Sequence, residues 1–387
     1  MPSDQDAPAP GAASPALVYD GRISELYGIF IPNLLLTIIT FGIYRFWAIT
    51  RLRRYMWAHM RFQEDRFEYT GTGGELFLGF ILALTILIVL GMVTAALAFG
   101  MVTAASAFGL RLIAAPLVVL LVLVFYAMIF VLAFAAIFSA QRYRLNRTLW
   151  RGIRGGMHGS AIRYGLRGVL YFLLNVITLY QMTPWMTLRL TERRLNASSF
   201  GNLAFGFRGR ARRIYLPFLA LFLVFVLLDV VFFVALFRQF GTAMLHAAPQ
   251  MKATDAGFSP PANLALLPFV LFGGVLAIGI VIGLVRSFYV AALAREVANH
   301  STLGPLRFAS TISAWALLRL VLGNVLIVLV TLGLGYPIVI HRDARLLARN
   351  LLVSGAIDPG TLRQNTERAS ALGEGMFQAL DASGGML

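Results

Sequence analysis

The segment Leu76–Phe99 reads LFLGFILALTILIVLGMVTAALAF and contains no charged side chain. A helix of about 20 such residues crosses the roughly 30 Å hydrocarbon core of a bilayer, because it satisfies its own backbone hydrogen bonds. Three further runs have the same character: Leu112–Phe138, Ile214–Phe237 and Leu264–Val285. Asp229 is the one residue in all four that is charged at neutral pH. The sequence therefore predicts four membrane-spanning helices.

Composition and charge agree with this prediction. Of the 387 residues, 59% are hydrophobic and 13% are charged, against roughly 45–50% and about 25% in soluble domains. The net charge of +16 comes from basic residues in short loops beside the apolar runs, which is typical of the positive-inside rule rather than of a nucleic-acid surface. All basic residues except Lys252 are arginine, which suits phosphate groups, although a GC-rich genome explains the arginines equally well.

The chain divides into a membrane region and two polar ends. Residues 1–20 have neither the basic nor the apolar part of a signal peptide, so we expect no cleaved leader and a disordered tail. Residues 356–387 are polar and rich in Gly, Ala and Ser, and we expect a second disordered tail. Between them we predict a first membrane repeat at 21–140, a second at 141–285 and a terminal partial repeat at 286–355.

Three apolar segments differ from the plain spans, namely Glu25–Phe46, Gly168–Leu188 and Leu317–Ile340. The first contains NLLLTIITFGIYRFW from Asn33 to Trp47, and the other two repeat its order of Asn, Thr and Tyr. We expect the Asn and Thr side chains to bond backbone groups left unpaired where these helices break, with ligand binding as the alternative. These candidate residues are Asn33, Thr40, Asn175, Thr178, Asn324 and Thr331.

The order of segments indicates an internal repeat. With the special segments written A and the plain spans B and C, the chain reads A-B-C-A-B-C-A. Short loops between them alternate aromatic residues with period two, as in Phe67 with Tyr69 and Phe205 with Phe207, which predicts short strands. The predicted fold is an all-α polytopic membrane protein with short strand-like cytoplasmic loops.

The segment from Asn33 to Trp47, the Arg-rich helix that follows it, and FEYTGTG from Phe67 to Gly73 resemble a known family. It is the bacterial domain-of-unknown-function 898 (DUF898), or YjgN-like, family of uncharacterised inner-membrane proteins. The resemblance covers the chain from about Asp20 to Asp358, and Phe46 stands where the family typically has proline. It implies the architecture and a location in the bacterial inner membrane, and it implies no activity.

Loop charge bears on whether the special segments cross the membrane. Seven arginines lie between Arg142 and Arg167, before the middle special segment, and seven lie between Arg189 and Arg213, after it. Short loops this basic are both expected on the cytoplasmic side. The special segments are then re-entrant or interfacial, so that Asn146, Arg208 and the N-terminus all face the cytoplasm. The alternative, seven crossings, rests on the length of the first and third segments.

Two groups of residues are candidates for function. Asp229 lies deep in a span, where an unpaired acid costs about 2.5–3.5 kcal/mol, so it is either a coupling site or a neutral hydrogen-bonding group. Arginines that follow the special segments are candidates for binding anionic lipid head groups. They are Arg51, Arg53, Arg54, Arg189, Arg193, Arg194, Arg342 and Arg345.

The sequence gives no sign of catalysis. It has no cysteine, its five histidines are scattered, and it lacks a serine-protease order, a P-loop and a zinc-protease motif. We therefore expect no enzyme, no metal and no cofactor. Two functions are left open: transport of a small solute or lipid, and a non-transporting envelope or scaffold role in which the Arg-rich cytoplasmic face binds anionic lipid or a partner protein.

Overall fold

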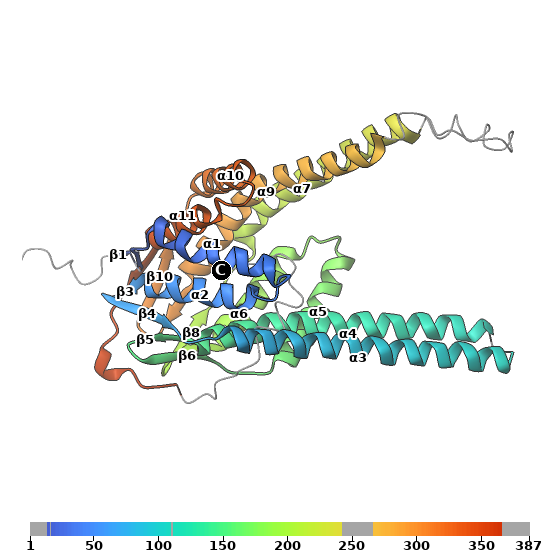
Figure 1. Ribbon diagram of the computed structural model, residues 1–387, viewed down its shortest axis with the longest axis horizontal. Coiled ribbons are helices and arrows are strands. Elements are labelled where there is room, and N and C mark those ends of the chain that lie inside the picture. The colour runs from blue at the N-terminus through green and yellow to red at the C-terminus, as the bar shows by residue number, and fades with distance from the viewer. Residues whose placement is uncertain (1–13, 16, 110, 242–265, 366–387) are drawn as a thin grey trace, which may run out of the picture. The chain divides into compact units, whose positions relative to one another are not determined.

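The structure is a computed structural model that describes residues 14–15, 17–109, 111–241 and 266–365 (Figure 1). It divides into two compact units. The first comprises residues 1–209, 297–311 and 334–387, and the second comprises residues 210–296 and 312–333. These units do not follow the predicted repeat boundaries, which stay predictions.

An antiparallel sheet of eleven short strands organises the first unit. Its spatial order is β1-β11-β10-β9-β8-β7-β6-β5-β4-β3-β2, so consecutive strands from β2 to β11 pair with one another, while β1 pairs with β11. The strands are β1 Ser14–Pro15, β2 Val18–Tyr19, β3 Met60–Phe62, β4 Asp65–Tyr69, β5 Thr148–Trp150, β6 Ile153–Met157, β7 Ser198–Phe200, β8 Leu203–Phe207, β9 Ser301–Leu303, β10 Leu306–Ser310 and β11 Leu351–Ser354.

The chain links the two ends of this sheet. Its outermost strands, β1 and β2, are separated by two residues of chain and pair with β11 and β3, not with each other. Alternate strands place one large side chain each in a shared core, where Trp150 lies 5.3 Å from Phe62 and 6.2 Å from Phe200 between ring centroids. Leu303 and Val353 continue this set, and Leu306 of β10 is also buried in the core. The expected strand-like loops are therefore strands, but a single sheet that joins them was not part of the all-α prediction.

Parts of both expected tails are ordered. Residues 14–15 and 18–19 form β1 and β2, and Ile357 and Leu362 pack against the core of the sheet. The side chain of Gln364 bonds the turn between β5 and β6, where its Nε2 donates to Gly152 O at 3.0 Å. Backbone pairing and apolar burial thus order segments whose composition indicated disorder. Residues 1–13 and 366–387 of these tails lie outside the described residues.

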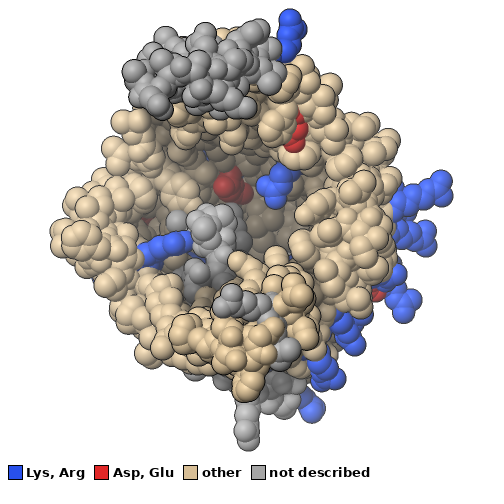
Figure 2. All heavy atoms as spheres, turned by 90° about the vertical axis from the view of Figure 1, so that its right-hand side faces the viewer, with Lys and Arg blue, Asp and Glu red and all other residues tan. Residues whose placement is uncertain are grey.

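Four helices in the described residues are long and apolar enough to cross a membrane, as predicted. They are α3 Gly73–Ala107, α4 Arg111–Asn146, α7 Arg212–Leu236 with its π-helical continuation η1 Phe237–Gly241, and α9 Leu267–Asn299. Apolar side chains are exposed along all four, and Figure 2 shows uncharged residues over most of the face drawn. A protein that exposes this much apolar surface belongs in a bilayer.

The pair α3 and α4 is fixed at its sheet end. Thr72 and Glu75 form a capping box that begins α3. The Glu75 carboxylate also accepts from Tyr143 OH at 2.6 Å and pairs with Arg147, both at the end of α4. Because α3 begins just after β4 and α4 ends just before β5, the start of α3 and the end of α4 both adjoin the sheet.

Each special segment is a pair of shorter helices separated by a turn. The pairs are α1 Ile23–Ile39 with α2 Arg45–Ala58, α5 Ala161–Ile177 with α6 Thr183–Asn196, and α10 Ala314–Val330 with α11 Tyr336–Asn350. In the first turn Phe41 and Gly42 have φ of 49° and 89°, and Gly42 N donates to Thr37 O at 2.7 Å. This left-handed arrangement ends the helix. The first helix of each pair has 17 residues, about 25 Å, which is short of a bilayer core.

The second unit contains α7, most of α9 and α10. The rings of Phe218 on α7 and Tyr289 on α9 lie 5.8 Å apart, and Phe288 and Trp315 join α9 to α10 at 5.5 Å. Glu296 is 4% exposed, and its Oε1 accepts from Arg210 N at 2.7 Å. These contacts hold the ends of α7 and α9 together.

Candidate functional site

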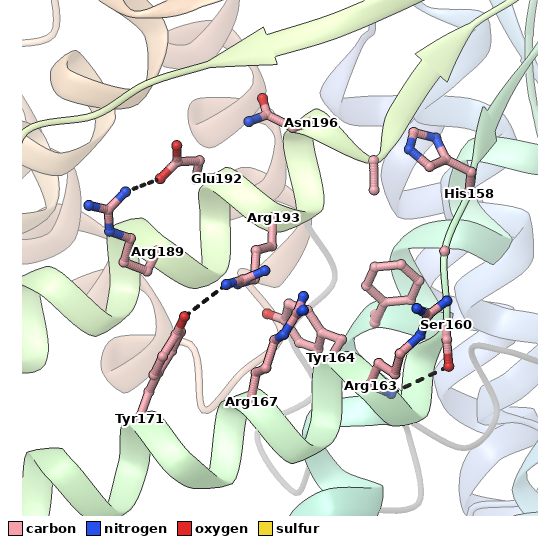
Figure 3. Close-up of a pocket in the computed structure, with 13 residues that line it drawn as sticks. His158, Ser160, Arg163, Tyr164, Arg167, Tyr171, Arg189, Glu192, Arg193 and Asn196 are labelled. Atoms are coloured by element: carbon pink, nitrogen blue, oxygen red, sulfur yellow. Dashed lines mark hydrogen bonds and ion pairs between the residues drawn. The ribbon is translucent and has the colours of Figure 1, made fainter.

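A pocket of about 560 Å³ lies between α5 and α6 and is lined by four arginines (Figure 3). Helix α5 contributes Arg163 and Arg167, and α6 contributes Arg189 and Arg193. Residues four apart lie on one face of a helix, so each helix turns a basic face toward the other. Glu192 is the one carboxylate among the lining residues. The pocket therefore has three net positive charges when its histidine, His158, is neutral.

Tight packing against α4 sets the rotation of α5. A β-carbon at Gly165 would lie 2.4 Å from Val131 O, and one at Gly168 would lie 2.4 Å from the Phe134 ring. Only glycine permits this approach, so this face of α5 is fixed against α4. The arginines at 163 and 167 are then left on an exposed face.

The arginines of α6 are held by neighbouring side chains. Arg193 donates to Tyr171 OH at 3.0 Å and lies over that ring at 5.9 Å, while Arg189 donates to Glu192 at 2.7 Å. The side chains of Arg163 and Arg167 have no hydrogen-bonding partner among the described residues. Two preorganised guanidinium groups thus lie beside two whose donors are available to a ligand.

The start of α5 adds further donors to the pocket. Ser160 caps this helix, where its Oγ accepts from Arg163 N at 3.4 Å, and His158 and Gly159 precede it in the pocket wall. A helix N-terminus has unpaired backbone N–H groups and a partial positive charge, which favour an anion. With the guanidinium groups, this arrangement is suited to phosphate, which arginine binds through two parallel hydrogen bonds.

The predicted helix-break residues lie at or near the turns, and two of them bridge the paired helices. Asn175 is 3% exposed and shares two hydrogen bonds with Thr183, at 3.1 and 3.2 Å. Asn33, 6% exposed, accepts from Arg51 at 3.4 Å. Both asparagines thus bond side chains of the second helix, whereas the expectation was backbone groups.

The threonines bond the backbone. Thr40 accepts from Tyr44 N at 2.9 Å across the turn and donates to Leu36 O at 2.7 Å. Thr178 and Thr331 donate to carbonyls one turn earlier, at 3.0 and 2.6 Å. Asn324 is half-buried on α10.

The arginines predicted to bind lipid fall into different environments. Arg189 and Arg193 line the pocket, whereas Arg194 is half-buried and is not among its lining residues. Arg53 is 3% exposed and donates to Tyr69 OH at 3.4 Å, so it is part of the packing around α2. The others lie on α2 or α11 and are exposed or half-buried: Arg51, Arg54, Arg342 and Arg345.

Asp229 lies in the middle of α7 with a half-buried side chain. It has no hydrogen-bond or ion-pair partner among the described residues, and Arg319, considered as its partner on sequence grounds, is not bonded to it there. Among those same residues no group of three metal-ligating side chains is found.

Comparison with known proteins places this arrangement in a family. The family model described as bacterial protein of unknown function (DUF898) matches residues 14–379. The chain belongs to the DUF898 family. The resemblance seen in the sequence is thereby confirmed, and with the four long apolar helices it makes the chain a bacterial inner-membrane protein.

Two named relatives of this DUF898 protein are similar over a short stretch. The inner membrane protein YjgN of Salmonella typhimurium is 41% identical over 73 residues, which cover 19% of this chain and 18% of the relative. The Escherichia coli K12 protein of the same name is 42% identical over 64 residues, or 16% of each chain. The matched stretch thus spans under a fifth of either relative, and no solved structure matches.

The pocket includes residues that sequence reasoning did not single out. Arg163 and Arg167 were assigned to a loop, but α5 begins at Ala161 and carries both in its first two turns. Their spacing with Tyr171, at intervals of four, was a visible helical signal. The sequence did not show that α6 packs beside α5, because this packing depends on the turn between the two helices.

Proposed function

We propose that this DUF898 protein binds the phosphate head group of an anionic lipid in the arginine pocket between α5 and α6. The observation that carries the proposal is the convergence of four guanidinium groups with one carboxylate in a single pocket. Like charges gathered this closely repel one another, and an anion relieves that repulsion. Charge-assisted hydrogen bonds to phosphate add to the gain.

The distribution of polarity along the α5–α6 pair favours a lipid over a free anion. The arginines lie toward the ends of both helices that adjoin the sheet, while the turn end of the pair exposes Leu173, Ile177 and Leu179 at 53%, 77% and 75%. Such an apolar end is suited to the bilayer interior, with the arginines at the head-group level. The ligand phosphate would then be held at the membrane surface.

We infer that the three special segments re-enter the membrane from the cytoplasmic side. In support, the Arg-rich loops on both sides of the middle segment contain β5–β6 and β7–β8, and β6 pairs directly with β7. Paired strands lie on one side of a bilayer. The short first helix and the left-handed turn of each segment also favour a return over a crossing.

The internal repeat is part of the same proposal. Each of the four hairpins from β3–β4 to β9–β10 has a strand of three residues followed by one of five. Helices of 17 residues begin all three special segments. Such recurrence supports duplication of one unit of helix, hairpin and helix.

Transport of a solute or lipid is the second candidate function. Broken helices with buried polar residues, here Asn33 and Asn175, are typical of transporter binding sites. Asp229 supplies a charge within a span, but a single acid gives no proton relay. That the protein is not an enzyme stays a prediction.

The binding proposal can be tested with the purified full-length protein in nanodiscs of zwitterionic lipid. Short-chain phosphatidic acid and phosphatidylglycerol are titrated against short-chain phosphatidylcholine, with inorganic phosphate as a separate arm. We expect the anionic lipids to bind at least about tenfold more tightly than phosphatidylcholine, as charge-assisted hydrogen bonds predict. Tighter binding of inorganic phosphate than of either lipid would identify a soluble anion instead.

A matched pair of variants locates the site. Arg163→Gln with Arg167→Gln should remove the preference for anionic lipid, since these side chains have donors available. The control is Arg208→Gln with Arg349→Gln, which removes two exposed arginines outside the pocket. An equal loss of preference in both double variants would show that binding follows total charge, and would contradict the proposal.

A further inference from the structure

A second cavity, of about 350 Å³, lies between α1, α2 and α11 in the first unit. Its walls are mostly aliphatic, with Leu26 and Ile29 from α1, Leu52 from α2 and Ile340 from α11. The volume falls in the range of about 300–1,000 Å³ that is typical of ligand pockets. It shares no residue with the arginine pocket and is independent of the function proposed for that pocket.

The cavity is elongated and has a polar end. Along α1 its lining runs from Leu26 to Thr37, about 16 Å at the rise of a helix. Thr37 lies near the turn, where Arg45 begins α2, and Tyr336 begins α11. The polar lining groups are the Arg45 guanidinium, the hydroxyls of Thr37 and Tyr336 and the amide of Asn33, while the lining at Leu26 and Leu52 is apolar.

Arg45 gives this cavity its chemical selectivity. Its side chain is half-buried, and no carboxylate pairs with it among the described residues. An unneutralised guanidinium in a mostly apolar cavity is costly, so an anion beside it is favoured. The N-terminus of α2 lies at the same place, and its partial positive charge has the same effect.

The surroundings of the cavity are apolar. The outer face of α1 exposes Leu35, Ile38 and Ile39 at 55%, 65% and 70%, and these side chains are suited to contact with lipid acyl chains.

We propose that the cavity between α1, α2 and α11 binds a single-chain anionic amphiphile, with its aliphatic chain along Leu26, Ile29, Leu52 and Ile340 and its terminal acid group beside Arg45. Apolar walls recognise the chain by burial. The guanidinium recognises the acid, whether carboxylate or phosphate.

The experiment uses three photo-reactive probes of equal chain length that carry a diazirine near the methyl end and terminate in a carboxylate, a phosphate or a hydroxyl. Full-length protein in nanodiscs is labelled, and the modified peptides are mapped by mass spectrometry. We expect cross-links within residues 26–52 and 336–340, and at least about tenfold more labelling by the better acid than by the alcohol. The stronger of the two acid arms identifies the head group.

Variants separate the charge from the cavity. Arg45→Gln should reduce the acid-to-alcohol ratio to about one, and Arg45→Lys should retain most of it and so controls for folding. Ala48→Phe fills the cavity and should reduce labelling by all three probes, whereas Arg349→Gln, on the exposed face of α11, should change nothing. Equal labelling by acid and alcohol in the wild type, or cross-links that map outside these residues, would overturn the proposal.

Discussion

At the scale of single residues, several buried or half-buried polar side chains are paired across helices. Glu75 joins α3 to α4, and Asn175 with Thr183 joins α5 to α6. Such bonds fix helix ends where backbone groups lose their own partners. Asp229 and His341 depart from this pattern, because neither side chain has a hydrogen-bonding partner among the described residues.

The absence of a described partner for Asp229 leads to an expectation about stability. An unpaired acid in a span is unfavourable by about 2.5–3.5 kcal/mol, so Asp229→Leu should raise the thermal midpoint of the detergent-solubilised protein. Asp229→Asn should fold like the wild type and complement a deletion strain. A well-folded Asp229→Asn protein that fails to complement would instead make proton- or cation-coupled transport the leading function.

His341 should make stability depend on pH. Burial lowers the pKa of His341 below its ordinary value, and the nearby Arg345 lowers it further. The unfolded chain then binds the proton more readily, so stability is full above about pH 6.5 and falls as the pH drops toward the folded-state pKa.

Thermal unfolding at pH 7.5 and 5.5 checks this expectation. His341→Phe keeps an aromatic ring beside Tyr19, whose ring centroid lies 5.4 Å from that of His341. This variant should lose less thermal stability between pH 7.5 and pH 5.5 than the wild type. His158→Gln changes an exposed histidine and should leave the decline unchanged. An unchanged decline in His341→Phe would exclude this residue as its source.

At the scale of elements, each special segment is defined by its turn. The pattern of Asn, Thr and Tyr predicted where each helix breaks, and apolar runs predicted the four long helices, although α9 continues to Asn299, past the predicted end at Val285. The spacing of Arg163, Arg167 and Tyr171 indicated that α5 begins before the apolar run, but the face that α5 buries and the ordered parts of the tails were not predictable. They depend on packing against α4 and on strand pairing, which are contacts between residues distant in the sequence.

The turn between α1 and α2 can be tested with two glycines. Gly42 has φ of 89° with open space around it, whereas Gly28 lies within α1, also in open space. Gly42→Ala should destabilise the protein by about 1–2 kcal/mol, the cost of a left-handed conformation. Gly28→Ala should stabilise it by up to about 1 kcal/mol through helix propensity. Equal effects of the two changes on the unfolding midpoint would argue against the left-handed turn.

At the scale of the whole molecule, one sheet of short strands joins the ends of the helices of the first unit. Among the described residues no strand exceeds five residues, and a lone hairpin of this size is marginal in water. Pairing all eleven strands in one sheet gives them a shared apolar core. Local alternation predicted the strands, but their order in the sheet depends on pairing between residues distant in the sequence.

The central claim is that all these hairpins lie on one side of the membrane because the special segments re-enter it. The chain has no cysteine, so single cysteines can be introduced at the exposed positions Arg151 and Arg208. Arg151 is used instead of Asn146 because Asn146 is buried. Phe108, 78% exposed between α3 and α4, serves as the outer control. In intact spheroplasts an impermeant maleimide should label position 108 and spare 151 and 208, which become reactive after lysis. Labelling of 208 from outside while 151 stays protected would contradict the account.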